Sequence, residues 1–408
     1  MEKLTLYSIY QSIHTINLFQ HLSGYWDLSL ITYLDSLNLD QKILSRYEQI
    51  KEKPKIIADL TYAPKIRNYI LSHPFRSLYD LFLSRNQFRK MIYYRRKAIS
   101  VLKILADFQP SILYTHQLDT ALIAYLSGFK PYVITFWGSD FYQNLEKIKQ
   151  KKLIRDCICN AAKIQTMNDE MKQYLIERFG VLPENIHVQN FGVDISRFPV
   201  NVNKKSLKEK YGIKEKFVIL SSRFSLDKEI FRLDLIIEAF KKIKEKQPDF
   251  DVRLIFINNV LREETLKELV DKLGLTEEIT FKEFLEGNEY VDYLMLADVT
   301  VQCPLHDGVS VSVMESLAAG SPIITTRGTG TEVNVKENIN GVFLNERSAT
   351  EIADKILLVL LDKEKLSLLS KNARKWVEDH CQRTIAMKKI SEMLFSAIKN
   401  HEIDRVDI

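Results

Sequence analysis

The fold is decided by residues 299–325, which read VTVQCPLHDGVSVSVMESLAAGSPIIT. A short β-branched run comes first, and a turn that contains Gly308 follows it. The next residues have apolar side chains at helical spacing, and a second short apolar run closes the stretch. This pattern predicts a strand over 299–302, a helix over 311–319 and a strand over 322–325. A strand, helix and strand in succession indicate an α/β fold with a parallel sheet.

The same alternation extends through the chain in two arrays of similar size. We expect two Rossmann-like domains, 1–199 and 200–380, with 201–210 as a lysine-rich linker. A C-terminal helix over 381–408 follows, and a return to the N-terminal domain is one option for it. In such sheets ligands bind beyond the carboxyl ends of the strands. The other predicted strands are 4–9, 28–33, 56–60, 112–115, 132–135, 163–166, 187–189, 217–221, 252–257 and 279–281. The other predicted helices are 15–22, 87–107, 169–179, 234–246, 264–273, 289–296, 350–361 and 386–399.

Composition sets outer limits on the class of protein. With 408 residues of which 46% are hydrophobic, the chain has enough apolar side chains for packed cores. The formal net charge of +5 is too small to name a partner. The N-terminus lacks the features of a signal peptide, and no apolar run has the length of a membrane span. We therefore expect a cytoplasmic protein.

The cysteines agree with a reducing compartment. The chain has four of them, scattered along its length, which is unlike a disulfide scaffold. A C-x-C pair at 157 and 159 has no second cluster nearby, so ordinary helix residues are favoured over a structural metal site. The cysteines are Cys157, Cys159, Cys303 and Cys381.

The deciding stretch also carries a candidate ligand site. Gly308 lets the backbone pass close to a ligand, and the amides after it lie at a helix N-terminus, where anionic oxygens bind. Asp307 in the loop suits sugar hydroxyls, and Glu315, about two turns into the helix, suits the two hydroxyls of a ribose. The alternative is a plain crossover in which Asp307 only caps the helix.

Two more strand ends of the second array carry polar groups. Arg223 and Lys228 follow its first strand, and such cations suit a diphosphate. The alternative is a solvated loop, because acidic residues are interspersed. Gly328 and Gly330 follow a later strand and let backbone amides approach a ligand, while Glu332 suits a hydroxyl. An ordinary strand-to-helix turn explains that loop equally well.

Strand ends of the first array offer a second set of candidates. Ser12 and His14 follow the first strand, and His116 ends a later one. Each histidine is either a base or a surface or capping residue. Trp137 and Asp140 follow the strand at 132–135, where Asp140 either binds a hydroxyl or caps the next helix.

Together these residues resemble the family-four retaining glycosyltransferases. Seven residues separate Asp307 from Glu315, which resembles the E-x7-E signature of that family. The family adopts the GT-B fold, in which two Rossmann-like domains face a cleft and the second binds most of the donor. Other stretches match in the right order along nearly the whole chain. They are Ser12-Ile-His-Thr, Trp137-Gly-Ser-Asp140, Asn190-Phe-Gly-Val-Asp194-Ile-Ser-Arg-Phe198, Arg223 with Lys228, 328–332 and Asn340-Gly341.

The resemblance implies roles for the matching residues. Arg223 and Lys228 would bind the donor phosphates, and Glu315 the ribose. Asp307 and the amides near Gly308, Val309 and Ser310 would hold the sugar and the diphosphate. The loop with Gly328, Gly330 and Glu332 would complete the donor site, and Ser12, His14, His116, Trp137 and Asp140 would line the acceptor side.

The sequence departs from the family pattern at three places. Asp307 stands where the family has Glu, and Trp137 stands where it has His, which indicates an altered sugar pocket. The loop after Arg223 carries extra residues, so Arg232 is a substitute for Lys228 as the second phosphate ligand.

Residues 61–103 form a basic and aromatic segment. They include ten Lys and Arg against one acid, together with eight aromatic residues. This mixture suits an anionic membrane surface or nucleic acid, and the alternative is a solvated helix face with its aromatics in the core. Because the rest of the chain resembles a glycosyltransferase, a membrane surface is favoured over nucleic acid as the partner of this segment, and we expect no nucleic acid partner.

The combined prediction is a retaining, metal-independent hexosyltransferase without a cofactor. Its donor would be a UDP-sugar ahead of a GDP-sugar. Its acceptor would be a cell-envelope polysaccharide, a lipid-linked oligosaccharide or a glycolipid, reached at the inner face of the cell membrane. The alternatives are a GT-B-like protein that binds nucleotide or nucleic acid without transfer, and a nucleotide-sugar epimerase of GT-B type.

Overall fold

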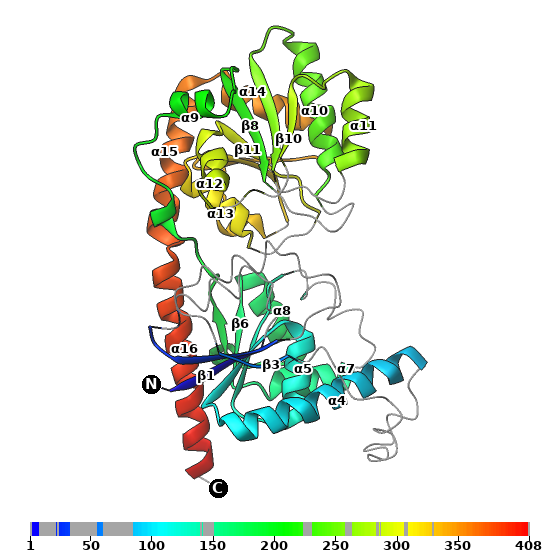
Figure 1. Cartoon of the computed structure of the whole chain (residues 1–408), viewed down its shortest axis with the longest axis vertical. Helices are drawn as coiled ribbons and strands as arrows, with labels where there is room; N and C mark the ends of the chain where they lie inside the picture. The colour runs from blue at the N-terminus through cyan, green and yellow to red at the C-terminus, as the bar shows by residue number, and fades with distance from the viewer. Residues whose placement is uncertain are drawn as a thin grey trace. The chain divides into compact units, whose positions relative to one another are not determined.

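The chain divides into two compact units. The structure is a computed structural model, in which the first unit comprises Met1–Asn190 and Met387–Ile408 and the second comprises Phe191–Ala386 (Figure 1). The residues that it describes are 2–7, 22, 24–32, 55–59, 85–138, 141, 151–222, 231–257, 263–282, 285, 287–305, 309–328 and 330–406.

The first unit is built on a parallel sheet with strand order β3-β2-β1-β4-β5-β6-β7. Its strands are β1 (Lys3–Tyr7), β2 (Asp27–Thr32), β3 (Lys55–Asp59), β4 (Ile112–His116), β5 (Tyr132–Thr135), β6 (Lys163–Thr166) and β7 (Ile186–Val188). The chain turns back between strands through α4 (Arg85–Phe108), α5 (Gln117–Ser127), α7 (Lys151–Cys159), α8 (Asp169–Phe179) and η2 (Pro183–Asn185). β4, β5 and β6 are buried along their whole length, as expected for central strands covered on both faces.

Local sequence sets the ends of these helices. At α8 the Asn168 side chain accepts from the Met171 amide at 2.8 Å, and Asp169 and Glu170 occupy the positive first turn. Gly180 ends the same helix in the left-handed conformation at φ 71°. The predicted helix at 169–179 is therefore confirmed residue for residue.

The second unit repeats the plan with strand order β10-β9-β8-β11-β12-β13. Its strands are β8 (Phe217–Ser222), β9 (Val252–Ile257), β10 (Ile279–Lys282), β11 (Val299–Val301), β12 (Ile323–Thr326) and β13 (Gly341–Leu344). Its helices are α9 (Lys204–Lys210), α10 (Leu233–Lys246), α11 (Glu263–Leu273), α12 (Gly287–Leu296), α13 (Val311–Ala318), α14 (Ala349–Leu360) and α15 (Lys363–His380), with η3 (Ile195–Arg197) and η4 (Thr331–Val333). α10 packs on α11 and α14, and their apolar faces close the core around β8 and β9 (Figure 1). The predicted α/β fold with two parallel sheets is confirmed.

The predicted linker at 201–210 is wrong over most of its length, because residues 204–210 form α9. Asn203 caps this helix by accepting from the Lys205 and Ser206 amides. The side chains of Lys204 and Lys208 reach the Asp298 carboxylate at 3.4 and 3.3 Å. These lysines are therefore structural anchors of a helix rather than part of a solvated connection.

Two segments distant in the sequence meet in the second unit. The Val193 amide donates to the Cys381 carbonyl at 2.7 Å, and the Arg383 amide donates to the Val193 carbonyl at 3.0 Å. A Cβ on Gly192, where φ is 63°, would lie 2.8 Å from the Arg383 backbone. The segment 191–198 is thus tied to the second unit, ahead of the predicted boundary at 199.

The last helix, α16 (Arg383–Val406), continues into the first unit. There Phe395 stacks on Trp26 with ring centroids 4.1 Å apart, and the Trp26 indole donates to Ser391 at 2.9 Å. These contacts bury Trp26 and fasten the end of the chain beside β2.

Candidate active site

The N-terminus of α13 lies beside the carboxyl end of β11. Ser310 caps the helix by accepting from the Val313 amide at 3.4 Å, and its hydroxyl lies 3.0 Å from that of Ser312. The Gln302 amide donates to Ser312 at 3.2 Å and joins the strand end to the helix. Both Val309 and Ser310 are buried, so this helix start is packed rather than solvated.

Glu315 is a buried carboxylate held from two other elements. The Tyr290 hydroxyl, on α12, donates to its Oε2 at 2.8 Å. A guanidinium nitrogen of Arg197, on η3, lies 3.6 Å from its Oε1. The Glu315 residue is only 9% exposed, so these contacts take the place of much of its hydration.

The electrostatics of Glu315 combine opposing effects. Burial raises the pKa of its carboxyl, while the Tyr290 hydrogen bond and the charges of Arg197 and Arg383 lower it. Arg383 is itself buried, and burial lowers the pKa of its guanidinium against the attraction of Glu315 and Asp194. Burial is the largest of these effects, so the pKa of the Glu315 carboxyl is raised, and Tyr290, Arg197 and Arg383 limit the rise.

Polar groups gather at the carboxyl ends of β8 and β12. Ser221, Ser222 and Thr325 are buried, and their hydroxyls have no hydrogen-bond partner among the residues described. Thr326 donates to the Pro304 carbonyl at 2.8 Å and ties two neighbouring strand ends together.

The loop after β12 folds on its own carboxylate. The Gly328 amide donates to Glu332, and Lys336 donates to the Glu332 carbonyl at 2.7 Å. Gly330 stands at φ 84°, a conformation that favours glycine. One oxygen of Glu332 is therefore already engaged with the backbone of its own loop.

In the first unit, β4 and β5 bring His116 and Trp137 together. The buried His116 ring meets Tyr114 edge-on at 4.8 Å and Trp137 at 5.3 Å. Under them, Gln165 accepts from Thr135 at 3.0 Å and from Tyr114. His116 is part of a packed aromatic cluster, so a surface position is excluded for it.

Several predicted site residues lie outside the described residues. They are Ser12, His14, Asp140, Arg223, Lys228, Asp307 and Gly308. Arg232, the substitute for Lys228, is described, and its guanidinium forms a fork on Asp234 at 2.9 to 3.2 Å. The structure thus brings Val309, Ser310 and Glu315 together on one helix start and places Gly328, Gly330 and Glu332 in the next loop.

Three residues around Glu315 received no role from the sequence. Arg197 lies within the Asn190–Phe198 stretch that resembles the family, but the resemblance gives it no role. Arg383 falls at the start of a predicted helix. Tyr290 meets Glu315 across 25 positions of sequence, a contact for which no local pattern exists. The one signal in the sequence for these partners was that Arg197 is a charged residue inside a stretch that resembles the family.

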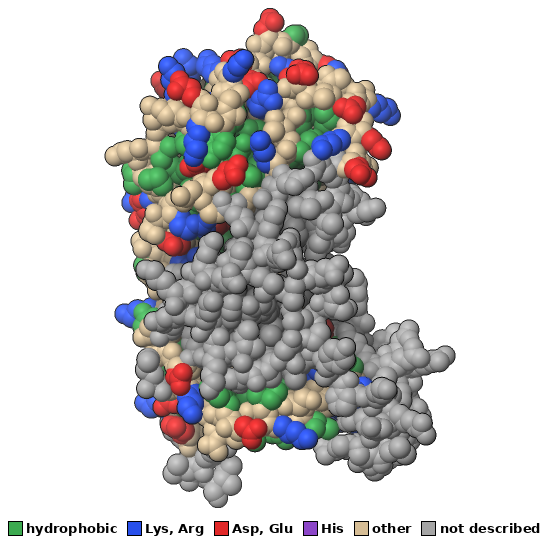
Figure 2. All heavy atoms as spheres, in the orientation of Figure 1, with side chains coloured by type: hydrophobic (Ala, Val, Ile, Leu, Met, Phe, Trp, Pro, Cys, Tyr) green, Lys and Arg blue, Asp and Glu red, His purple; other side chains and the backbone are tan. Residues whose placement is uncertain are grey.

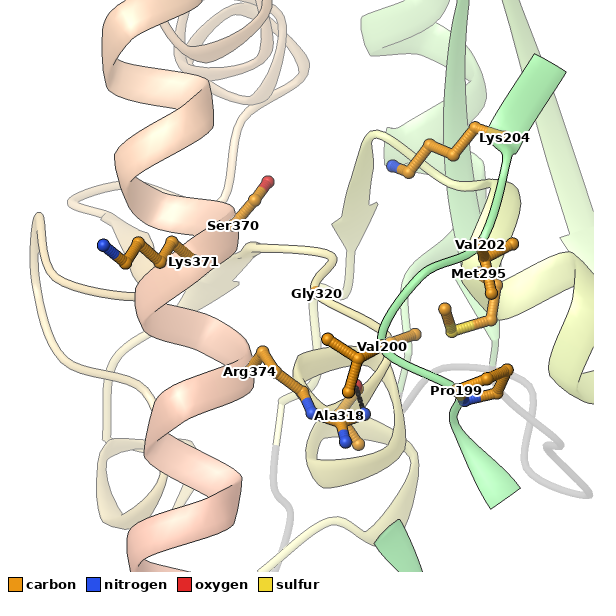
Figure 3. A pocket seen from close by; sticks show the side chains of 11 residues that line it. Pro199, Val200, Val202, Lys204, Met295, Ala318, Gly320, Ser370, Lys371 and Arg374 are labelled. Atoms are coloured by element: carbon orange, nitrogen blue, oxygen red, sulfur yellow. Dashed lines mark hydrogen bonds between the residues drawn. The ribbon is translucent and has the colours of Figure 1, made fainter. Parts of the chain in front are cut away.

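A cavity of about 280 Å³ opens at the other end of α13 (Figure 3). Ala318, Ala319 and Gly320 line it together with Pro199 and Val200. Arg374, another lining residue, donates to the Phe198 and Ala318 carbonyls at 2.6 and 2.9 Å. Because α13 contributes only its C-terminal end to this lining, the cavity is separate from the helix start described above.

The face of the second unit that Figure 2 draws carries charges of both signs, with acidic and basic side chains interspersed. Among the described residues, no cluster of three or more His, Cys, Asp or Glu could hold a metal ion. Within the same residues, no helix is both long and apolar enough to cross a membrane.

Comparison with known proteins identifies the class. The family described as "Glycosyl transferases group 1" matches residues 203–376, and "Glycosyltransferase Family 4" matches residues 54–197. YtcC of Bacillus subtilis, named as a glycosyltransferase, is 25% identical over 317 residues, which cover 74% of this chain and 76% of that protein. The UDP-Gal:alpha-D-GlcNAc-diphosphoundecaprenol alpha-1,3-galactosyltransferase of Escherichia coli is 25% identical over 75% of this chain and 80% of its own.

The solved structures agree on the fold. HepE of Anabaena, crystallised in complex with UDP, has a TM-score of 0.75 at 16% identity and covers 97% of this chain and 100% of its own. Two parallel α/β units with matches to both halves define a GT-B glycosyltransferase. The chain belongs to the group 1 glycosyltransferases, and the predicted resemblance is confirmed.

Proposed function

We propose that this enzyme is a retaining hexosyltransferase that uses a nucleoside diphosphate sugar, with UDP ahead of GDP. The observation that carries the proposal is the buried Glu315 carboxylate on α13, close to the carboxyl edge of the second sheet. A ribose offers two adjacent hydroxyls to such a carboxylate. The Escherichia coli relative supports UDP by its name, and a Mycobacterium tuberculosis relative, 24% identical over 212 residues, is named as GDP-mannose-dependent.

The proposed reaction conserves the configuration of the sugar. The bond from the anomeric carbon to the β-phosphate oxygen breaks, and the acceptor oxygen forms a bond to that carbon on the same face. The acceptor proton passes to the departing phosphate, and the products are a glycoside and a nucleoside diphosphate. Positioning and stabilisation of the leaving group contribute more to this reaction than a strong protein base. Arg223, Lys228 and the amides near Gly308 would stabilise the phosphates without a metal.

The acceptor is proposed to be a cell-envelope polysaccharide or a lipid-linked glycan. The Escherichia coli relative is named for a diphosphoundecaprenol-linked acceptor. The segment 61–103 would bring a cytoplasmic enzyme to an anionic membrane surface. Arg96 and Lys97 are buried in α4, so the other basic residues of the segment would make that contact. Cosedimentation with anionic liposomes at low salt tests this, and failure to bind would contradict it.

The donor proposal is tested by thermal shift and by hydrolysis. We expect UDP to raise the melting temperature more than GDP, ADP or CMP, because a ligand of the folded state stabilises it. Slow hydrolysis of the matching nucleotide sugar would then separate transfer from binding alone. Binding without turnover, with cell-envelope acceptors present, would favour the alternative of a nucleotide-binding protein without transferase activity.

A further inference from the structure

The contacts of Glu315 leave a defined number of acceptor positions open. Each carboxylate oxygen has about two lone pairs directed for hydrogen bonds. Tyr290 uses one position on Oε2, and Arg197 approaches Oε1. Arg197 lies 3.6 Å from Oε1, which is an ion pair rather than a hydrogen bond. Counting only the described residues, each oxygen therefore keeps at least one acceptor position, and two adjacent ribose hydroxyls would fill one on each.

The same carboxylate belongs to a charge-balanced cluster. Arg197 forms an ion pair with Glu315, and Arg383 interacts electrostatically with the two acids Glu315 and Asp194. Asp194 accepts from the amide and the hydroxyl of Ser196, which fixes the turn that carries Arg197. The backbone bonds between 193 and 381–383 hold Arg383 in place. The cations near Glu315 are thus set by the tied segments at 191–198 and 381–383.

Burial makes the charge balance of this cluster important for stability. Arg383 is 5% exposed, and its Nε has no hydrogen-bond partner among the described residues. A cation in such surroundings costs free energy unless an anion compensates it. Burial lowers the pKa of the Arg383 guanidinium, and the charges of Glu315 and Asp194 raise it, so these two acids supply the compensation.

We propose that Tyr290 and Arg197 are positioning residues, which fix the Glu315 carboxylate so that one acceptor position on each oxygen meets the ribose hydroxyls of the donor. This inference rests on the proposed function, in which Glu315 binds a nucleotide ribose. It adds that ribose recognition depends on α12 and on the segment 191–198, to neither of which the sequence assigned a role in ribose binding.

The test compares a nucleotide with its hydroxyl-free analogue. UDP, or GDP if it stabilises the wild-type chain more, is titrated by calorimetry beside its 2′,3′-dideoxy form. For Tyr290→Phe we expect an affinity loss of about 5- to 10-fold for the ribonucleotide and none for the dideoxy form. Arg197→Gln should show the same selectivity, and Arg197→Lys should restore most of the affinity.

The affinity of both variants should also respond to pH. Removal of the Tyr290 hydroxyl or the Arg197 charge removes a contribution that lowers the pKa of Glu315. The fall in ribonucleotide affinity with decreasing pH should therefore occur at higher pH than in the wild type, while Arg197→Lys keeps the wild-type profile.

Matched controls exist in the same unit. Tyr211 donates to Asp292 at 2.9 Å much as Tyr290 donates to Glu315, and Arg253 pairs with Glu215 at 2.6 Å. Tyr211→Phe and Arg253→Gln should leave both nucleotide affinities unchanged. Melting temperatures of all variants establish that the compared proteins are folded.

The outcomes separate the two proposals. Equal losses on both nucleotides, or no loss on either, would overturn the positioning roles while wild-type binding upholds the proposed function. No binding of any nucleotide by the wild-type chain would overturn the proposed function and this inference with it.

Discussion

The two units use one architecture for different chemical surfaces. In the first unit, the ends of β4 and β5 present His116 and Trp137, whose rings pack edge to face. In the second, the end of β11 leads to α13, where Glu315 is held by Tyr290 and Arg197. One strand-end surface is aromatic and the other is charged, although both sheets are parallel and similarly ordered.

The difference shows what each edge can bind. A buried carboxylate beside cations suits a ligand that offers hydroxyl groups. Such a site requires the carboxylate to keep its charge, because the nearby cations depend on it. Rings in edge-to-face contact suit the apolar face of a sugar and carry few charges. Under the proposed function the second edge binds the nucleotide and the first contributes to the acceptor side, and each of these roles can be tested separately.

The largest effect is expected from Glu315→Gln. The amide keeps the shape but loses the charge that Arg197 and Arg383 face, and it offers only one acceptor oxygen to the ribose. We expect kcat/KM for transfer to fall about 100-fold, which corresponds to about 2.7 kcal/mol of transition-state stabilisation. The nucleotide-induced thermal shift should vanish in the same variant.

Asp292 supplies the control for that experiment. It too is a partly buried carboxylate that accepts from a tyrosine and pairs with a cation, since Tyr211 lies at 2.9 Å and Lys210 at 2.8 Å. Asp292→Asn should retain activity within about threefold, because these contacts lie on the surface of α9 and α12. Equal losses in the two variants would show that Glu315 acts only through stability.

A second large effect concerns the segment that carries Arg197. At Gly192 an added Cβ would meet the Arg383 and Cys381 backbone at 2.8 Å. We expect Gly192→Ala to lower the free energy of unfolding by about 3–5 kcal/mol, from backbone strain and overlap together. Chemical denaturation monitored by circular dichroism measures this.

A substitution at Gly212 separates the effect of steric overlap from that of backbone strain in the Gly192→Ala result. It has φ 66°, close to the 63° of Gly192, but a Cβ there would meet nothing within 4 Å. Gly212→Ala should therefore cost only about 1–2 kcal/mol, the strain of a left-handed alanine. If the two variants were equally stable, the tie between 191–198 and 381–383 would be unimportant.

The sequence predicted the sheets far better than the surroundings of the site. Strands such as 252–257 are buried apolar runs whose period and bounds are local properties, and the structure has β9 at those residues. The run 201–210 was misjudged because lysines usually indicate solvent, whereas the Asp298 that anchors two of them is about ninety positions away.

The candidate site likewise has one part that the sequence predicted and another part that it did not. Seven residues separate Glu315 from Asp307 in the sequence, and Glu315 falls in a predicted helix, so a local pattern can place it. Its partners come from α12, η3 and the start of α16, and only the folded chain brings these elements together. Long-range contacts of single polar side chains leave no periodicity in the sequence, which is why Tyr290 and Arg383 were not anticipated.

A moderate effect is expected in the first unit from Trp137→Phe. The substitution keeps a ring beside His116 but removes the indole N–H, the hydrogen-bond donor that stands where the family has histidine. We expect kcat/KM for transfer to fall about 3- to 10-fold with the nucleotide-induced thermal shift unchanged. Trp376→Phe, at an indole whose ring lies tilted against that of His380 in α15, is the control and should change neither quantity. Loss of the thermal shift in Trp137→Phe would contradict the claim that the nucleotide binds at the second edge and not at the first.

The smallest effect is a pH dependence that distinguishes binding from stability at Glu315. Burial raises the pKa of this carboxyl above its ordinary value of 4.5, so the folded chain binds the proton more tightly than the unfolded chain. Between the ordinary and the raised pKa, the Glu315 contribution to stability must therefore increase as pH falls. Nucleotide affinity should change in the opposite direction, because a protonated carboxyl loses its charge and one acceptor position. Titrations of the nucleotide and unfolding curves from pH 7 to 5, on the wild type and Glu315→Gln, measure both signs. A parallel loss of affinity and stability that depends on Glu315 would contradict the assignment of a ribose-binding carboxylate to the charged edge.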